Sequence, residues 1–385
     1  MKSYLNEVPL FVDTIRQIRE IVIVNIILIG QIPAPTFQEE DRAAFLLDRM
    51  AEFQVDECST DSYGNPFGII RGTSPGKPPI FVVAHLDTIL DKDADHNFTV
   101  TENSIAGPGI LDNSTSVGVL ASLPEIFRRT GLCFESDIVL AGVIQSIGKG
   151  NLGGIRHLVK TWPGPVRGAV CLESGELGRL NYYSDGMIRC EVESNIPRAD
   201  GWGHKFKPNA ILTLNEIINE ILKMPLPQRP RARVIIGKIL GGYKHGIIAQ
   251  NANLGFEIQS KSDKMVKKIF SDIKDIVNGY SHEYEVDLKL RVISSQKAAR
   301  LKYNHPLVKS VVAVMKKLNL KPTSEPSESE LSVFLSRNIP AVTLGITHGN
   351  NFHHKNAMIE IEPMFRGIAQ ILGVLMAIDR GACDE

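Results

Sequence analysis

A short apolar run in this sequence ends in residues that could bind a metal ion. The run from Ile80 to Ala84 is rich in β-branched residues, and His85 and Asp87 follow it. Such a run predicts a strand buried on both faces, and in open α/β sheets the functional groups lie just past the carboxyl ends of strands. Residues two apart in an extended chain point the same way, so His85 can face a metal ion while Asp87 orients it. The alternative is a strand that simply ends in a polar turn.

Two more acids and a histidine occupy comparable places. Asp112 ends a Gly-Pro-Gly-Ile-Leu-Asp segment just before a helix of small residues, where it could bind a cation or cap the helix. Glu173 ends the apolar run that begins at Gly168, and His353 lies in a loop after the last expected strand. Imidazole and carboxylate groups suit zinc or a similar divalent ion, and a bridging carboxylate such as Asp112 could hold two ions for hydrolysis.

The elements that must position these residues alternate between strands and helices. Helical periodicity predicts one helix over 8–33, and Thr36 with Glu39 forms a capping box for a second helix. Strands alternating with helices, and polar groups at strand ends, predict an α/β sheet with helices on both faces. The remaining expected strands are 55–58, 67–71, 137–144, 168–172 and 339–345, and the remaining helices are 114–123, a helix ending at 160, 306–318 and 364–378.

The pattern changes near residue 187. From there to residue 295 the expected order is strand, helix, strand, strand, helix, strand, which fits a ferredoxin-like α+β domain. It interrupts the first pattern, which resumes afterwards. The sequence therefore predicts one domain from 1–186 and 296–385, and an inserted domain at 187–295.

The bulk composition narrows the class of protein. The 385 residues contain 43 Lys+Arg and 43 Asp+Glu, so no net field would attract nucleic acid or an anionic membrane. The 43% hydrophobic and 22% charged residues are typical of a soluble globular enzyme. Five cysteines without CxxC spacing indicate reduced thiols in a cytoplasmic protein. The apolar patch at 21–32 is too short to span a bilayer.

Taken together, the motifs resemble the co-catalytic zinc peptidase family that includes aminoacylase, acetylornithine deacetylase, succinyl-diaminopimelate desuccinylase, peptidase T and carboxypeptidase G. The resemblance covers nearly the whole chain and implies a zinc-peptidase-like sheet with an inserted lid and dimerisation domain. The segments that carry it are Pro33–Glu39, His85–Thr88, Gly107–Asn113, Gly150–Gly154, Glu173, Gly203-His204, Asn338–Gly345 and the His353 loop.

The resemblance also implies roles for individual residues. Asp87 would support His85, and His204 in the inserted domain would reach a neighbouring subunit's active site and stabilise an oxyanion. The expected cofactor is zinc, one ion and a less certain second, with cobalt or manganese as alternatives. The protein would be a homodimer through the inserted domain. The implied ligands are His85, Asp112 and Glu173 for one metal ion, and Asp112 with His353 for a second.

The chain departs from the family at several positions. After the strand ending at Ile144 the family has two consecutive glutamates, the general base and a metal ligand, where this chain has Ser146 and Ile147. Serine is not a base at neutral pH without a partner. Gly246 and Gln259 stand where the family's lid has an asparagine and an arginine that binds the substrate carboxylate.

Three functions remain open. The first is an altered metal-dependent enzyme that hydrolyses, transfers or condenses an amide or related acyl bond in a small-molecule or peptide-like substrate. Glu176, His354 and Glu330 are its candidate substitute bases. The second is an inactive ligand-binding or scaffold protein on the same fold. The third is an ordinary peptidase or deacylase whose base lies elsewhere in the chain.

Overall fold

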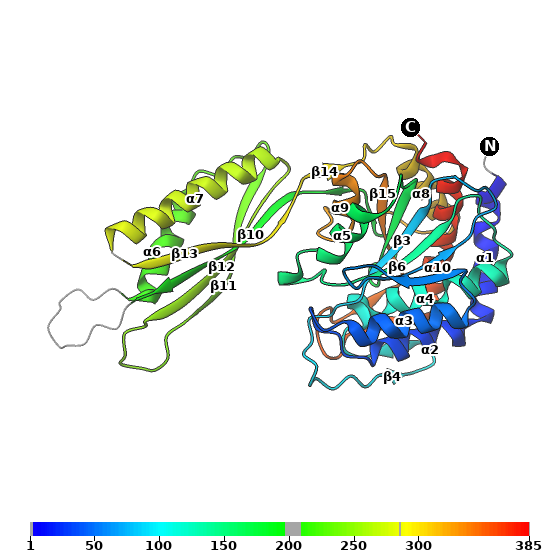
Figure 1. The fold of residues 1–385 in the computed structure, drawn as a ribbon, viewed down its shortest axis with the longest axis horizontal. Coiled ribbons are helices and arrows are strands. Elements are labelled where there is room, and N and C mark those ends of the chain that lie inside the picture. Colours follow the sequence, from blue (N-terminus) through cyan, green and yellow to red (C-terminus); the bar gives the residue numbers. More distant parts are fainter. Residues whose placement is uncertain (1–2, 197–208, 285, 385) are drawn as a thin grey trace. The chain divides into compact units, whose positions relative to one another are not determined.

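The computed structural model describes residues 3–196, 209–284 and 286–384. It divides into two compact units, each with its own core (Figure 1). Unit 1 comprises Met1–Tyr183 and Arg300–Glu385, and unit 2 comprises Ser184–Ala299. All five cysteines are free thiols.

A seven-stranded mixed sheet forms the centre of unit 1. Its middle strands β6, β3, β7 and β15 run parallel, while β1, β2 and β8 pair antiparallel at the edges. The parallel strands are buried along their whole length, as their unbroken apolar runs predict. In sheet order the strands are β1 (Glu57–Thr60), β2 (Pro66–Ile70), β6 (Ile138–Val143), β3 (Ile80–His85), β7 (Gly168–Glu173), β15 (Ala341–Gly345) and β8 (Leu180–Asn181).

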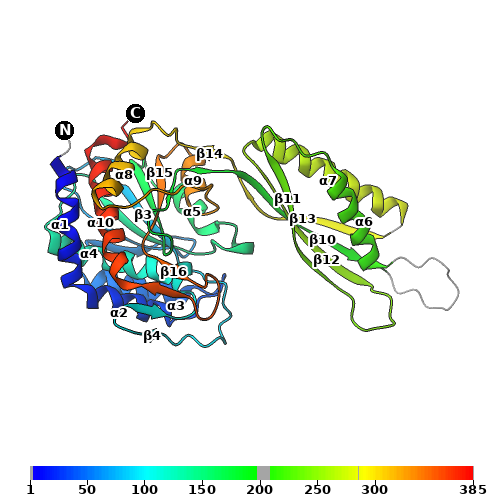
Figure 2. The same cartoon turned by 180° about the vertical axis from the view of Figure 1, so that it is seen from behind.

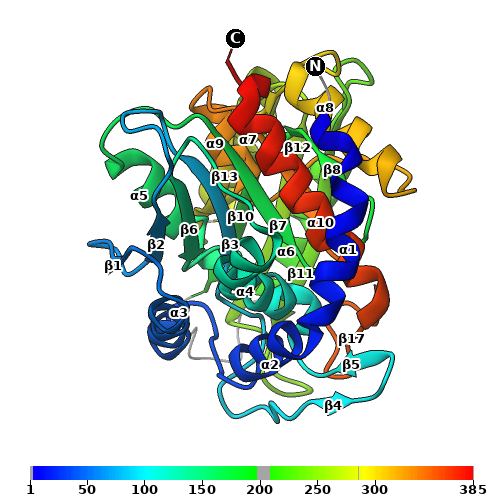
Figure 3. The same ribbon diagram turned by 90° about the vertical axis from the view of Figure 1, so that its right-hand side faces the viewer.

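Helices cover both faces of this sheet (Figure 3). On one face, Ile80, Val82 and Ala84 of β3 join the main apolar core. On the other, Phe81 packs against Phe334, with ring centroids 6.1 Å apart. The first face carries α1 (Val8–Gln17), α2 (Arg19–Gly30), α3 (Glu40–Glu52), α4 (Thr115–Thr130), α8 (Pro306–Lys317) and α10 (Ile361–Ala377), and the second carries α5 (Gly153–Thr161) and α9 (Leu331–Ser336).

Helix α10 is a long apolar helix of unit 1. It lies beside α1 and α8 (Figure 2). With the following turn it forms the segment Ile361–Ala382, which is long and apolar enough to cross a membrane, but 83% of its 18-residue apolar window is buried inside the protein. Its apolar character therefore matches a helix of the protein core. Single-turn segments at Ser3–Asn6, Ile110–Ser114, Gly148–Gly150 and Ile378–Ala382 complete the helical elements.

A small antiparallel sheet joins two distant parts of unit 1. Its order is β16 (Gly349–Asn350), β17 (Met358–Glu360), β5 (Ser104–Ala106) and β4 (Thr99–Val100). Met358 pairs with Ala106. This pairing brings the loop between β16 and β17 next to the turn that follows β5, so it sets the distance between His353 and Asp112.

Unit 2 has the strand and helix order expected of a ferredoxin-like domain. Its antiparallel sheet has the order β11-β12-β10-β13, and α6 and α7 pack on one face through Leu214, Ile217, Ile269 and Ile273. The elements are β10 (Gly186–Asn195), α6 (Ala210–Lys223), β11 (Ala232–Gly241), β12 (Asn251–Ser260), α7 (Asp263–Glu283) and β13 (Asp287–Gln296). Two further strands, β9 (Tyr183–Ser184) and β14 (Ala299–Arg300), pair with each other.

Two local predictions were wrong. The helix expected over 8–33 is two helices, because the backbone leaves the helical region at Ile18 (φ −109°, ψ 21°). Thr36 does not cap a helix, because α3 begins only at Glu40. The Thr36 hydroxyl instead donates a hydrogen bond to Asp87. The threonine therefore holds an acid 51 residues further along the chain and does not begin a helix.

Candidate metal centre

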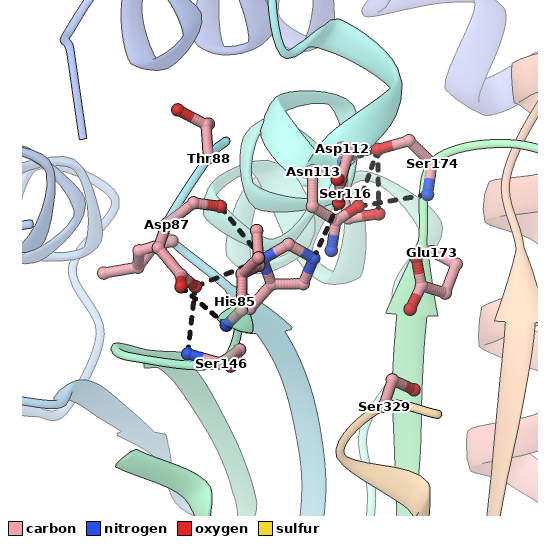
Figure 4. A network of polar contacts seen from close by, with 12 residues as sticks. His85, Asp87, Thr88, Asp112, Asn113, Ser116, Ser146, Glu173, Ser174 and Ser329 are labelled. Carbon is pink, nitrogen blue, oxygen red and sulfur yellow. Dashed lines mark hydrogen bonds and ion pairs between the residues drawn. The ribbon is translucent and has the colours of Figure 1, made fainter. Parts of the chain in front are cut away.

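His85 lies at the carboxyl end of β3, between two aspartates (Figure 4). Its Nε2 is 3.1 Å from Asp112 Oδ1. Its Nδ1 is 3.1 Å from the Asp87 carbonyl oxygen and 3.4 Å from Asp87 Oδ1. Burial acts to lower the pKa of the imidazole, but the hydrogen bonds to Asp112 and Asp87 outweigh it and raise the pKa well above its usual value. Both ring nitrogens are therefore held by oxygen atoms.

Asp112 connects two histidines that are far apart in the sequence. Its Oδ1 faces His85, and its Oδ2 is 3.1 Å from His353 Nε2. Burial would raise the pKa of Asp112, yet hydrogen bonds from His353 and His85 lower it far below its usual value. The hydrogen bond to Asp112 raises the pKa of His353 in turn. One carboxylate thus presents one oxygen to each of two imidazoles.

The turn that carries Asp112 is fixed by its neighbour Asn113, which the sequence reasoning missed. The Asn113 amide donates to the carbonyl of Leu172 at 2.9 Å. Its Oδ1 accepts from the backbone and the hydroxyl of Ser174, at 3.1 and 2.7 Å. Asn113 therefore ties the turn to the end of β7. Its place directly after the candidate ligand was the only signal in the sequence.

Glu173 ends β7 on the same face of the sheet as His85. Val83 pairs with Cys171 in parallel register, so two residues further on Glu173 lies beside His85. The side chain is 12% exposed, and no described residue donates a hydrogen bond to it. Its cation neighbour is Arg179, with Nη1 3.9 Å away. Burial raises the pKa of Glu173 to about 7, with a contribution from the charge of Glu330.

Asp87 is fully buried and is held by the loop that follows β6. Its Oδ1 accepts from the backbone amide of Ser146 at 3.2 Å. Its Oδ2 accepts from the amide of Ile147 at 2.8 Å and the hydroxyl of Thr36 at 2.9 Å. Ser146 and Ile147 stand where the family has two glutamates. Their backbone amides therefore donate hydrogen bonds to Asp87, the acid that orients His85.

The three candidate substitute bases lie in different surroundings. Glu176 is exposed and pairs with Arg179, and His354 is exposed in its loop. Glu330 is only 2% exposed and accepts a 2.7 Å hydrogen bond from the Ser146 hydroxyl. Of the three, Glu330 is the one that the structure brings to this site.

The predicted residues of the inserted domain are not gathered into a site within unit 2. His204 lies outside the described residues. Gly246 lies in an exposed turn with a positive φ of 77°. The Gln259 side chain is held within its own sheet by hydrogen bonds to Arg233 and Glu257.

The side chains at this site meet part of the requirements of a divalent ion. In the described part of the chain, no three His, Cys, Asp or Glu side chains converge closely enough to enclose one. Two atoms that bind one zinc ion tetrahedrally at 2.0–2.1 Å lie about 3.3 Å apart. The 3.1 Å separations of Asp112 from His85 and from His353 match this spacing. Together with the buried Glu173, whose carboxylate accepts no hydrogen bond from a described residue, these pairs fit part of a metal centre.

Solved structures share this fold. Aminopeptidase PepT from Bacillus cereus superposes with a TM-score of 0.72 at 15% identity, covering 94% of this chain and 98% of that chain. A di-peptidase from Saccharomyces cerevisiae gives 0.75 at 13% identity, covering 99% and 100%. A Bacillus subtilis protein described as a dinuclear metal binding peptidase of the M20 family gives 0.64 at 14% identity, covering 94% and 98%.

These neighbours confirm the fold that the motifs predicted. The chain has the α/β fold of M20-family metallopeptidases, as its resemblance to the co-catalytic zinc peptidases implied. No family model matches the sequence, and no curated protein matches it significantly.

Proposed function

We propose that this protein is a metal-dependent enzyme that acts on an amide or related acyl bond in a small-molecule or peptide-like substrate. One observation carries the proposal: Asp112 directs one oxygen to His85 and the other to His353. A carboxylate shared in this way is suited to bridge two metal ions. The neighbours with the same fold include an aminopeptidase, a di-peptidase and a dinuclear metal binding peptidase.

Each candidate residue would have its own role at a bound metal ion. His85, Asp112 and Glu173 would hold one ion, and Asp112 with His353 a second, with zinc the first choice and cobalt or manganese the alternatives. Such an ion polarises a carbonyl group and lowers the pKa of bound water. The protein's own contribution is orientation, because Thr36 and the loop amides fix Asp87. Asp87 in turn fixes the His85 ring.

An inactive ligand-binding or scaffold protein is the second candidate. The observation that favours it is the loop after β6, where Ser146 and Ile147 supply backbone amides and no carboxylate. General acid–base catalysis contributes about 10²–10⁴-fold, so an unreplaced base would slow hydrolysis by that factor. Acyl transfer or condensation would depend less on activation of water.

Metal content and turnover test these two functions together. The purified protein, dialysed against trace zinc, is expected to retain one or two ions per chain by mass spectrometry. Asp112→Asn should lose them, while Asp93→Asn, an exposed aspartate, should retain them. Activity on dipeptides and N-acyl amino acids should require the metal. Folded wild-type protein without bound metal would favour the scaffold function.

A further inference from the structure

Glu330 is a buried acid that none of the assigned roles uses. It lies directly before α9, which packs on the sheet face that carries Phe81, His85 and Glu173. Phe334, one turn further along α9, anchors the helix against Phe81. Glu330 is therefore positioned by the packing of α9 and is 2% exposed.

The Ser146 hydroxyl holds this carboxylate at the loop after β6. The distance from Ser146 Oγ to Glu330 Oε1 is 2.7 Å. The backbone amide of the same serine donates to Asp87, which orients His85. Figure 4 shows Ser146 beside Asp87, and Glu173 with Ser329, the residue before Glu330, on the opposite side of the His85 ring. The serine thus connects Glu330 with the acid that orients the candidate ligand His85.

Several acids are crowded on this face, and one of them has no cation beside it. Asp87, Asp112, Glu173 and Glu330 are buried or nearly buried. His85 and His353 pair with Asp112, Arg42 interacts with Asp87, and Arg179 lies 3.9 Å from Glu173. In the described part of the chain, no basic side chain forms an ion pair with Glu330. Burying several carboxylates together is costly unless a cation compensates them. Glu173 is 9% exposed, and its side-chain carboxylate accepts no hydrogen bond from a described residue, so the carboxylate oxygens can bind an ion.

We infer that Glu330 is a further metal-binding carboxylate, supplied by the segment before α9 in place of the acids that the loop after β6 lacks. Ser146 is the positioning residue that holds it. The Glu330 carboxylate accepts a hydrogen bond from the Ser146 hydroxyl. It therefore lies about as far from the Ser146 backbone as the carboxylate of a glutamate at position 146 would lie. This inference rests on the proposed metal dependence, and it assigns the serine a structural purpose.

Metal titration of the chelator-treated full-length protein tests the inference without a known substrate. Zinc binding is measured by calorimetry for the wild type, Glu330→Gln, Ser146→Ala and Glu325→Gln. Glu330→Gln should weaken at least one zinc ion by about tenfold or more, and Ser146→Ala should weaken it less. Glu325→Gln, which changes an exposed glutamate on the same segment, should bind like the wild type.

Thermal unfolding of the metal-free variants separates metal binding from a structural role. Removing one of the crowded carboxylates should raise the melting temperature of metal-free Glu330→Gln, while the increase caused by zinc becomes smaller. A residue that only held Ser146 would lower the melting temperature and leave zinc affinity unchanged. Glu330→Asp keeps the negative charge but shortens the side chain by one methylene group. This variant should still fold, and it should bind zinc more weakly than the wild type.

The outcomes distinguish this inference from the proposed function. If the wild type binds no zinc, cobalt or manganese, the proposed metal dependence fails and the role of Glu330 fails with it. If the wild type binds zinc and both Glu330 variants bind it equally tightly, the metal dependence stands and the role of Glu330 is overturned.

Discussion

Asp87 is the residue on which the order of the site depends, because three hydrogen-bond donors meet on one buried carboxylate. In Asp87→Asn the amide NH₂ must face one of those donors. We expect a loss of about 2–4 kcal/mol in the free energy of unfolding, measured by urea denaturation. Zinc affinity should also fall about 10–100-fold, because the His85 ring loses its support.

Asp93→Asn is the matched control for that prediction, since it makes the same change at an exposed aspartate. It should leave both stability and zinc affinity unchanged. If Asp87→Asn were as stable as the wild type, the prediction would be wrong. The Ser146 and Ile147 amides would then form equally good hydrogen bonds without the carboxylate.

Glu173 gives the metal-free protein a specific pH dependence. Its pKa rises from the usual 4.5 to about 7 in the folded state, chiefly through burial. The folded state therefore binds the proton more tightly than the unfolded state, and stability falls as pH rises from about 4.5 through 7. The shift corresponds to a loss on the order of 3 kcal/mol.

Comparison with Glu173→Gln isolates this contribution. Melting temperatures of both chelator-treated proteins are measured from pH 4.5 to 8, and the difference between them should grow with pH in favour of the variant. Added zinc should reverse the order above pH 7, because the charged carboxylate then has a cation. Parallel curves for the two proteins would contradict the assigned titration.

At the scale of the elements, the contact between α10 and the end of β15 leaves no space for a side chain. A Cβ at Gly367 would lie 1.8 Å from the carbonyl oxygen of Ile346. Gly367→Ala should therefore destabilise unit 1 by about 3 kcal/mol, as judged by thermal unfolding. Gly279 in α7 is also a mid-helix glycine, but nothing lies within 4 Å of a Cβ there. Gly279→Ala should stabilise by about 0.5–1 kcal/mol, and a loss in this control would question the open surface of α7.

Elements with long, regular patterns could be predicted from the sequence, while short elements set by packing could not. The unbroken apolar runs predicted β3 and β7, with His85 and Glu173 at their carboxyl ends. Helix α9 has six residues, too few for a periodic signal, and its position depends on Phe334 against Phe81. The sequence therefore offers Glu330 as a candidate base, but nothing in the sequence indicates that Glu330 contacts Ser146.

The turn at Asp112 shows the same limit between residues distant in sequence. The sequence contains the glycines and the acid of this turn, and they fit a metal ligand and a helix cap equally well. In the structure no side chain caps α4, which begins at Thr115, and the pairing of β17 with β5 brings His353 to Asp112. Such a contact depends on the register of two short strands that the sequence pattern did not reveal.

At the scale of the whole molecule, the inserted unit has one sheet edge suited to a second copy of the chain. Strand β11 lies at the edge of the sheet and pairs only with β12. Its Ile239 and Leu240 are 50% and 60% exposed. An edge strand with exposed apolar residues is a template for pairing with another strand. We therefore predict a homodimer through β11.

Sedimentation velocity at micromolar concentration should show that dimer. Replacing both Ile239 and Leu240 with lysine should give a monomer, because charged side chains on an edge strand oppose pairing. Val292→Lys is the matched control, since Val292 is 50% exposed on the opposite edge strand β13. Zinc content should be unchanged in the monomer, because every candidate ligand described here lies in unit 1. A dimer that survives the double lysine variant but dissociates with Val292→Lys would move the interface to β13.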